Sequence, residues 1–310
     1  MEHSLFTSIV VATIASGTPL VIAALGELVA ERAGVLDLGV EGTMAMGAIA
    51  AFAVALHTGS SVAGVLAGMA AGMAMALIFG VLTLTLMANQ VASGLALTIF
   101  GMGLSAFIGK PYESQSLPEI TALHIPYLSD LPFVGPVLFG QKSLVYFSWL
   151  LFGAVLWFLY RSRAGLVLRA IGESPSSAHS IGHPVILVRY LATLFGGAMS
   201  GVAGAYLSVY YTPQWVEGMV SGRGWIALAL VVFATWRPLR VVAGAYLFGG
   251  VLIMQLFLQG SGAQINIPSQ FLSSLPYWAT IIVLVLISRN PNTIRLHSPV
   301  SLGQPYRPDA

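Results

Sequence analysis

Cysteine is absent from this chain of 310 residues, and charged residues make up only 8% of it. The absence of cysteine excludes disulfides, iron–sulfur clusters and thiol chemistry. The scarcity of charge excludes an ordinary soluble globular protein, in which roughly a quarter of the residues are charged. Apolar residues instead reach 57%, the mean hydropathy is +0.86, and several long stretches carry no charge at all. Because a helix satisfies its own backbone hydrogen bonds in lipid, we expect an all-α polytopic membrane protein.

Catalytic motifs are also missing. The sequence has no HExxH metal helix and no GxSxG nucleophile turn. His179 and His183 share an i, i+4 spacing, but Pro184 follows directly, so we interpret them as solvated loop residues. Residues 103–111 resemble a phosphate-binding loop, yet proline stands where a metal-binding hydroxyl is needed. We therefore expect a non-enzymatic chain with no cofactor and no metal site, so that any ATP hydrolysis belongs to a partner chain.

The apolar stretches predict about nine transmembrane helices. We expect them at about 5–28, 34–57, 61–87, 91–109, 143–160, 190–211, 222–236, 241–259 and 272–288. If the arginine-bearing segment 161–189 is cytosolic, ten of the thirteen cations lie on the cytosolic side, which is the usual bias. This places the C-terminus in the cytosol and the N-terminus outside. Residues 1–310 then form a single transmembrane domain, with a cytosolic loop at about 161–189 and a proline-rich external loop at about 110–142.

Acidic residues interrupt the second apolar stretch. Glu27, Asp37 and Glu41 lie in the segment 26–48 among several glycines, which predicts a broken helix pair. Such breaks are tolerated where they line an aqueous cavity, and a carboxylate inside a membrane usually has a function or a buried partner. We expect these three residues to lie on a translocation path. The alternative, which we favour for the neighbouring Glu31, is an ion pair with an arginine at the membrane edge.

A second interruption lies at 214–238, where the apolar part is too short to span the bilayer. It predicts a half-helix whose first amides, at 222–225, are free to donate to an oxygen-rich solute. Arg223 would serve as a gate or as a surface anchor, and Trp225 would stack on a ring or anchor the helix. Gln255 and Gln259, one turn apart on a later span, would line the path or bond a neighbouring helix.

Glycines at four-residue spacing predict close helix packing. Gly64, Gly68 and Gly72 form one such row, and Gly197 and Gly201 form another. The cytosolic loop contains a different element, since residues 165–181 predict a short helix that is too polar to span. A helix of this kind usually meets another protein.

Three segments carry a resemblance to a known family: 31–48, 168–182 and 222–238. Together they resemble the permease subunits of bacterial ABC importers, in the nucleoside and simple-sugar branch, which is related to ribose and branched-chain amino acid permeases. The resemblance covers nearly the whole chain. Asp37 stands where that branch more often has asparagine, and Trp225 where phenylalanine is usual.

The resemblance implies a type II ABC importer permease fold in a bacterial cytoplasmic (inner) membrane. It implies that the cytosolic helix is a coupling helix that docks on an ABC ATPase subunit through the residues Arg169, Gly172, Glu173, Ser177 and Ala178. The other implied partners are a second permease subunit, identical or related, an external solute-binding protein, a small-molecule solute and membrane lipid, with no nucleic acid polymer. ATP-driven movement of two coupling helices would switch the cavity between outward and inward access.

Other functions remain open at this point. The leading hypothesis is the translocation subunit of an ATP-driven importer for nucleosides, and the nearest variants carry sugars or branched-chain amino acids. A self-sufficient transporter driven by ions would instead use Glu27, Asp37 and Glu41 as coupling residues. A scaffold protein would need no broken helices, so the two interruptions argue against it.

Overall fold

The computed structural model describes residues 5–124, 126–129, 131–260 and 298–307, with isolated residues between 271 and 285. This part of the chain folds into helices joined by turns and loops, and within it β pairing is limited to one isolated bridge between Ser116 and Gln214. The α-helices are α1 (Leu5–Arg32), α2 (Val40–Thr58), α3 (Ser61–Gly80), α4 (Gln90–Gly109), α5 (Ser143–Arg161), α6 (Arg163–Glu173), α7 (Pro175–Ser180), α8 (Val185–Ala205), α9 (Arg223–Phe233) and α10 (Pro238–Gly260).

Four shorter helical turns extend or link these elements. They are η1 (Val81–Thr85), η2 (Lys110–Tyr112), η3 (Gly135–Phe139) and η4 (Tyr206–Tyr211). The π-helical turns η1 and η4 continue α3 and α8 without a break in the chain, so these two elements are longer than their α-helical parts.

Seven helices within the described residues are long and apolar enough to cross a membrane. They are α1, α2, α3 with η1, α4 with η2, α5, α8 with η4, and α10. The expected span at 222–236 is the 11-residue helix α9, which at 1.5 Å per residue reaches only about 16 Å of the roughly 30 Å layer. Most of the span expected at 272–288 falls outside the described residues. The all-helical, multi-pass fold is confirmed, and the number of nine spans stays a prediction.

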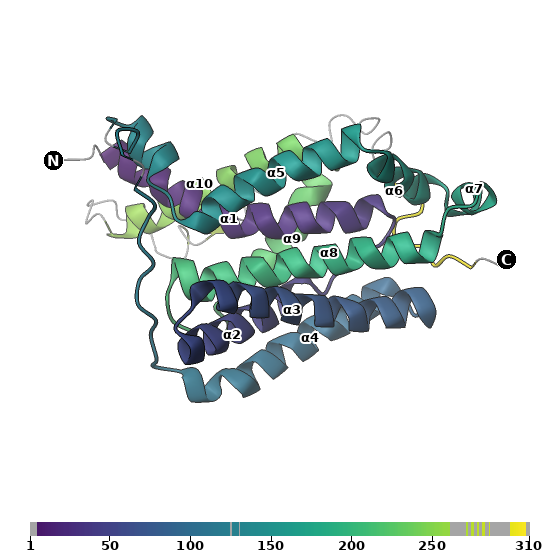
Figure 1. Ribbon diagram of the computed structural model, residues 1–310, viewed down its shortest axis with the longest axis horizontal. Helices are drawn as coiled ribbons and strands as arrows, with labels where there is room; N and C mark the ends of the chain where they lie inside the picture. Colours follow the sequence, from purple (N-terminus) through teal and green to yellow (C-terminus); the bar gives the residue numbers. More distant parts are fainter. Residues whose placement is uncertain are drawn as a thin grey trace.

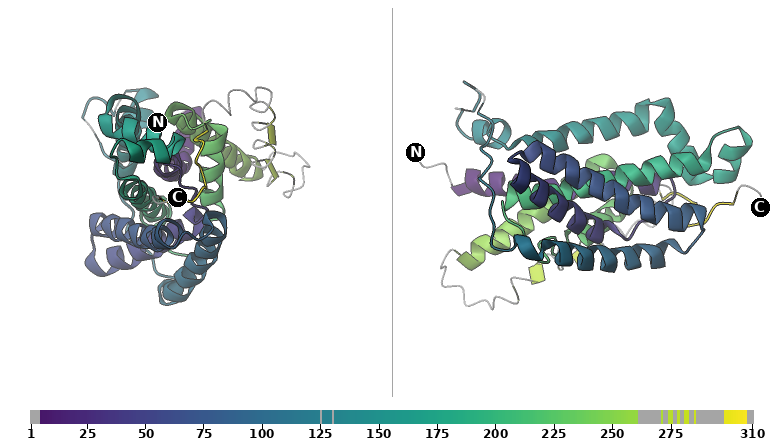
Figure 2. Two further views of the ribbon diagram at one scale, coloured as in Figure 1. Left: turned by 90° about the vertical axis from the view of Figure 1, so that its right-hand side faces the viewer. Right: turned by 60° about the horizontal axis from the view of Figure 1, so that its bottom comes forward.

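The long helices run side by side along the longest axis of the molecule (Figure 1). Helices α6 and α7 lie at one end with the C-terminus, on the right of Figure 1, and we call this the α6 end. The N-terminus, the turn between α2 and α3 and most of the loop 110–142 lie at the opposite end. The right-hand view of Figure 2 shows the same division of the two ends.

Helix α1 is at the centre of the bundle. Every residue from Ser16 to Arg32 is buried, and α1 packs against α8, α10, α9 and α5. This stretch carries Glu27, Glu31 and Arg32, which hydrocarbon cannot solvate, so neighbouring helices have to cover it.

The two glycine rows pack α3 against α8, as their spacing predicts. A Cβ atom on Gly72 would lie 2.1 Å from the carbonyl oxygen of Gly197, and one on Gly201 would lie 2.1 Å from that of Gly68. Real Cβ atoms do not approach a backbone so closely, so the two helix backbones touch only because these side chains are absent.

Replacing Gly72 with alanine is therefore expected to destabilise the protein. The added methyl group meets rigid backbone, and overpacking of this kind costs about 1–3 kcal/mol. Thermal unfolding in detergent should show a midpoint lowered by a few degrees. Gly153→Ala on α5 is the matched control, because nothing lies within 4 Å of its Cβ position. Equal midpoints for the two variants would contradict the close contact.

Candidate functional site

Helix α9 begins inside the bundle. The chain leaves η4 at the opposite end, turns back through residues 212–222, and starts α9 at Arg223 beside the first turn of α2. Gly222 makes this turn at φ +82°, a left-handed conformation that favours glycine. The chain therefore enters the bundle as a loop and continues to the α6 end as a half-helix.

The Glu41 side chain caps the N-terminus of α9. The Gly222 amide donates to Oε1 of Glu41 and the Gly224 amide donates to Oε2, both at 2.7 Å. A carboxylate there neutralises the positive end of the helix dipole and satisfies donors that the helix itself leaves unpaired. The prediction that the first amides of α9 are free for a solute is therefore wrong for Gly222 and Gly224, because a carboxylate of the chain already accepts both hydrogen bonds.

A cavity of about 400 Å³ lies against this junction. Helices α2 and α4, the loop before α9 and the first turn of α9 form its wall; the lining residues are Glu41, Ala45, Met102, Gly103, Ser105, Ala106, Trp215, Val216, Glu217, Gly218, Met219, Val220, Ser221, Gly222 and Trp225. Its size is within the roughly 300–1,000 Å³ of small-molecule sites. We call it the α9 cavity.

The α9 cavity combines acceptors with an aromatic face. Glu217 offers an exposed carboxylate, Ser105 and Ser221 offer hydroxyls, and the indole of Trp225 is 39% exposed, while the buried Glu41 carboxylate already accepts from the Gly222 and Gly224 amides. Hydroxyl groups of a solute find acceptors in such a lining, and a flat ring finds a stacking surface. The chemistry therefore suits a small, hydroxyl-bearing solute with a planar or pyranose-like face.

Of the residues predicted to lie on a translocation path, Glu41 and Trp225 line the α9 cavity together. Arg223 is not among the lining residues; its Nη1 donates to the carbonyl oxygens of Met219 at 3.0 Å and Val220 at 3.1 Å. This contact holds the loop before α9 in place. Gln255 and Gln259 lie far along α10 towards the opposite end and are not part of the cavity lining.

Glu27 and Asp37 meet in the turn between α1 and α2 and not in the α9 cavity. The Asp37 amide donates to Oε1 of Glu27 at 3.3 Å, and Oδ1 of Asp37 accepts from the Gly39 amide at 2.7 Å. Burial raises the pKa of the Asp37 carboxyl to about 6, and the Gly39 hydrogen bond opposes that rise. These two carboxyl groups shape the turn that delivers Glu41 to α9.

The other end of α9 is bound to α1. Nε1 of Trp236 donates to Oε2 of Glu31, while the guanidinium of Arg32 donates to the Trp236 carbonyl oxygen from Nη2 at 2.7 Å and from Nε at 3.2 Å. Thr235 and Trp236 both have positive φ, at 51° and 53°. Two successive non-glycine residues in this region carry strain that persists only where contacts hold them. Glu31 thus bonds the α9–α10 turn, in addition to its position beside Arg32.

The polar loop forms two helices where one was predicted. Helix α6 ends at Glu173, and α7 starts at Pro175 with Ser174 between them, whose Oγ accepts from the Ser177 amide at 3.4 Å. Proline at the first position of a helix is favourable but cannot continue the preceding one. The sequence Ser174–Pro175 contained this signal.

The five residues assigned to the coupling helix fall into two groups. Glu173 and Ser177 are exposed, so a partner could contact them directly. Gly172 and Ala178 are buried against the chain itself; a Cβ atom on Gly172 would lie 2.1 Å from the Arg32 carbonyl oxygen. Arg169 is half-buried, with its guanidinium carbon 5.4 Å from the centre of the Tyr160 ring. The buried pair positions α6 and α7 on the bundle.

Sequence reasoning missed a contact that residues 298–307 make at the α6 end. Arg189, which is 1% exposed, donates to the Ala33 carbonyl oxygen at 3.1 Å, to Ser301 Oγ at 3.0 Å and to the Gln304 carbonyl oxygen at 3.2 Å. Ser301 in turn donates from its amide and its hydroxyl to the Gly172 carbonyl oxygen, at 3.0 and 2.7 Å. Arg189 thereby ties α8, the α1–α2 turn, α6 and the C-terminal segment together. An arginine directly beside a long apolar run was the available signal.

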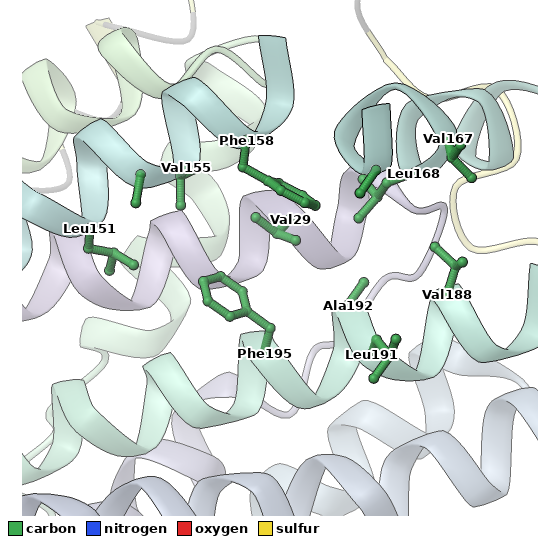
Figure 3. A pocket seen from close by; sticks show the side chains of 12 residues that line it. Val29, Leu151, Val155, Phe158, Val167, Leu168, Val188, Leu191, Ala192 and Phe195 are labelled. Atoms are coloured by element: carbon green, nitrogen blue, oxygen red, sulfur yellow. The ribbon is translucent and has the colours of Figure 1, made fainter. Parts of the chain in front are cut away.

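A separate groove of about 540 Å³ lies between α5, α6, α8 and α1. Figure 3 shows its lining side chains, among them Val29, Phe158 and Phe195. All twelve residues that line it are apolar. It therefore offers no hydrogen-bonding group to orient a polar solute, and the α9 cavity is the better candidate.

Comparison with known proteins shows the family of this chain. The family described as "Branched-chain amino acid transport system / permease component" matches residues 9–288. The chain is 41% identical to the "Putative glucose ABC transporter permease protein" of Haloferax volcanii, over 95% of this chain and 96% of that one. It is 30% identical to a nucleoside ABC transporter permease of Lactococcus lactis, covering 87% and 88% of the two chains, and 30% identical to a guanosine ABC transporter permease of Bacillus subtilis, covering 96% of each.

Proposed function

Because this chain belongs to the family of branched-chain amino acid transport system permease components, it is a non-catalytic ABC permease subunit of the inner membrane, and we propose that it imports a nucleoside. The family implies an ATPase subunit, a solute-binding protein and a small solute as partners. The observation that carries the proposed solute is the α9 cavity, which is lined by the exposed indole of Trp225 and the exposed carboxylate of Glu217. An indole stacks on a nucleobase, and carboxylates accept hydrogen bonds from ribose hydroxyls.

The proposed route for the solute follows from the half-helix. The loop 212–222 comes from the opposite end, which we propose to be external, and it forms much of the cavity wall. Helix α9 closes the cavity towards the α6 end, which we propose to be cytosolic. Movement of α9 away from α2 would open the cavity inward, and this is the alternating-access step of the proposed cycle.

The proposed partners have distinct places on the single domain 1–310. The ATPase subunit docks at α6 and α7, where Glu173 and Ser177 are exposed and Arg169, Gly172 and Ala178 support them. The solute-binding protein docks at the opposite end, which the loop 110–142 crosses. A second permease subunit, identical or related, completes the path. In this arrangement the N-terminus is external and the C-terminus is cytosolic.

A sugar is the second candidate solute. The relative in Haloferax volcanii with 41% identity bears a glucose transporter's name, while the two nucleoside-type relatives are 30% identical. The ring faces of sugars also stack on indoles, so the cavity itself accepts both classes. An ion-coupled mechanism loses support, because the family transports with an ATPase and because Glu27 and Asp37 lie away from the cavity lining.

Uptake by the reconstituted importer tests the function. The chain is placed in liposomes with its ATPase subunit and its other partner permease, and the binding protein is added outside with labelled guanosine, uridine or glucose. We expect ATP-dependent accumulation of a nucleoside that survives a proton uncoupler. Accumulation of glucose alone would replace the proposed solute with the second candidate, and accumulation on an ion gradient without ATP would overturn the ATP-driven mechanism.

A variant pair tests the docking end in the same preparation. Glu173→Arg should prevent the ATPase subunit from copurifying with the membrane subunits, because it reverses an exposed charge on the docking surface. Glu119→Arg, an equally exposed glutamate in the loop 110–142, is the matched control and should leave copurification intact. If Glu119→Arg prevents copurification and Glu173→Arg does not, the ATPase subunit docks at the opposite end and the proposed docking surface is wrong.

A further inference from the structure

Three arginines converge on one cavity beside the coupling helix. This cavity of about 690 Å³ lies between the end of α5, helix α6 and the start of α10. Its lining residues are Arg32, Leu156, Tyr160, Leu166, Arg169, Ala170, Glu173, Arg237, Pro238 and Leu239. Three positive charges face one negative charge there, so the cavity carries an excess of positive charge.

Arg169 has an unmet hydrogen-bonding group in this cavity. Its Nε is buried and has no hydrogen-bond partner among the described residues. Buried donors are normally paired, and an unpaired one costs about 1–3 kcal/mol unless a ligand or water completes it. The guanidinium also lies over the Tyr160 ring, which fixes its plane. The guanidinium is therefore held in a fixed plane at the cavity wall, with one donor that has no partner among the described residues.

The rim of the same cavity is apolar and exposed. Leu156, Leu166 and Leu239 line it with exposed fractions of 39%, 60% and 66%. Leu156 belongs to the last turns of a membrane span, and Leu239 to the first turn of another. Exposed leucines at the end of two spans contact acyl chains, so the cavity opens where the hydrocarbon meets the headgroups.

From these observations we propose that the cavity binds the phosphate headgroup of an anionic membrane phospholipid, with its acyl chains on the leucine rim. Guanidinium groups bind phosphate oxygens with paired, charge-assisted hydrogen bonds. Basic pockets at the cytosolic ends of spans are suited to such lipids. Leu156 and Leu239 lie in the end turns of two spans, where acyl chains surround the protein, and this favours lipid over a protein segment. The proposed orientation of the chain decides which leaflet supplies the lipid. The site itself does not depend on that orientation.

Bound lipid would affect the coupling between α6 and α9, because Arg32 and Arg169 both line the cavity. Arg32, at the cavity wall, also holds the Trp236 carbonyl oxygen at the end of α9, and it is within electrostatic reach of Arg169 and Glu173 on α6. A phosphate between these arginines relieves their mutual repulsion and draws α6 towards the end of α9. The lipid is thereby expected to stabilise the contact between the docking helix and the half-helix.

Thermal unfolding of the complex in nanodiscs tests this site without reference to transport. Each variant is compared with itself in discs of phosphatidylcholine alone and in discs that also contain phosphatidylglycerol, so a change in basal stability does not affect the result. We expect phosphatidylglycerol to raise the unfolding midpoint of the unaltered protein. Arg169→Gln should lose about half or more of this rise. The change removes one of the three arginines around the phosphate, and these bind it cooperatively.

Arg163→Gln is the matched control, because Arg163 is an exposed arginine on the same helix and does not line the cavity. It should keep the full rise. Equal rises in the unaltered protein and in Arg169→Gln would overturn the proposal. So would a full rise produced in phosphatidylcholine discs by inorganic phosphate alone, since a free anion would then be the occupant. Failure of nucleoside uptake would leave all these outcomes unchanged.

Discussion

Replacing Glu41 with glutamine is expected to lower solute uptake by at least about tenfold while the protein still folds. The carboxylate accepts hydrogen bonds from two amides, Gly222 and Gly224, and it neutralises the start of α9. Glutamine keeps the shape but has one acceptor oxygen, so its NH₂ group must face one of these amides. A buried amide that loses a charged acceptor costs about 1–3 kcal/mol, and 1.4 kcal/mol is a factor of ten. Uptake per folded complex, with folding checked by size-exclusion chromatography, measures the effect.

Glu217→Gln is the matched control for this experiment. Glu217 lines the same cavity but is exposed. Glu217→Gln alters one exposed solute contact and leaves the Glu41 hydrogen bonds to α9 in place, so it should lower uptake clearly less than Glu41→Gln does. Equal losses in both variants would mean that the negative charge of the cavity matters, and not the hydrogen bonds to α9.

Replacing Arg189 with leucine is expected to destabilise the α6 end by about 2 kcal/mol or more. Arg189 donates to the carbonyl oxygens of Ala33 and Gln304 and to Ser301 Oγ. Leucine leaves the buried Ala33 carbonyl oxygen without this donor, at about 1–3 kcal/mol, and also removes the contacts with Ser301 and with the exposed Gln304. Arg189→Lys keeps the charge but reaches fewer acceptors, so we expect an intermediate loss. The unfolding midpoint in detergent measures the total effect.

Cysteine labelling locates the effect, because the natural chain contains no cysteine. A single cysteine at Leu302, which is half-buried against the core, reports opening of the C-terminal segment. A water-soluble maleimide should react about fivefold faster or more when Arg189→Leu is added, because the segment then opens more often. Arg163→Leu, a change of an exposed arginine, should leave the labelling rate as it was. Unchanged labelling with Arg189→Leu would show that the segment is held by other contacts.

The sequence predicts local features of this fold well. Charge-free stretches identify the spans, the short apolar part of 214–238 identifies the half-helix α9, and the glycine rows identify the α3–α8 contact. Each of these depends on residues that are near one another in the chain. The cause of each feature is therefore visible in a short stretch of sequence: apolar surface for the spans, a short apolar length for α9, and missing side chains for the α3–α8 contact.

Contacts between distant residues are less accessible to such reasoning. Glu41 and Gly222 are 181 residues apart, and Arg189 and Ser301 are 112 apart. A lone glutamate near a helix start is equally compatible with a proton site, an ion pair or a cap on another helix. Only the packing of α2 beside α9 selects the cap. For the same reason the sequence could not separate Glu41, which lines the cavity, from Glu27 and Asp37, which do not.

The junction at Arg32 has a mechanical consequence. The Arg32 backbone carbonyl touches α6 at Gly172, and its side chain holds the turn that ends α9 at Trp236. Between that turn and Glu41 lie the 11 residues of α9, a rigid rod of about 16 Å. In the proposed cycle, a displacement of α6 by the ATPase would therefore be transmitted through Arg32 to the α9–α10 turn, and through α9 as one rigid body to its hydrogen bonds with Glu41.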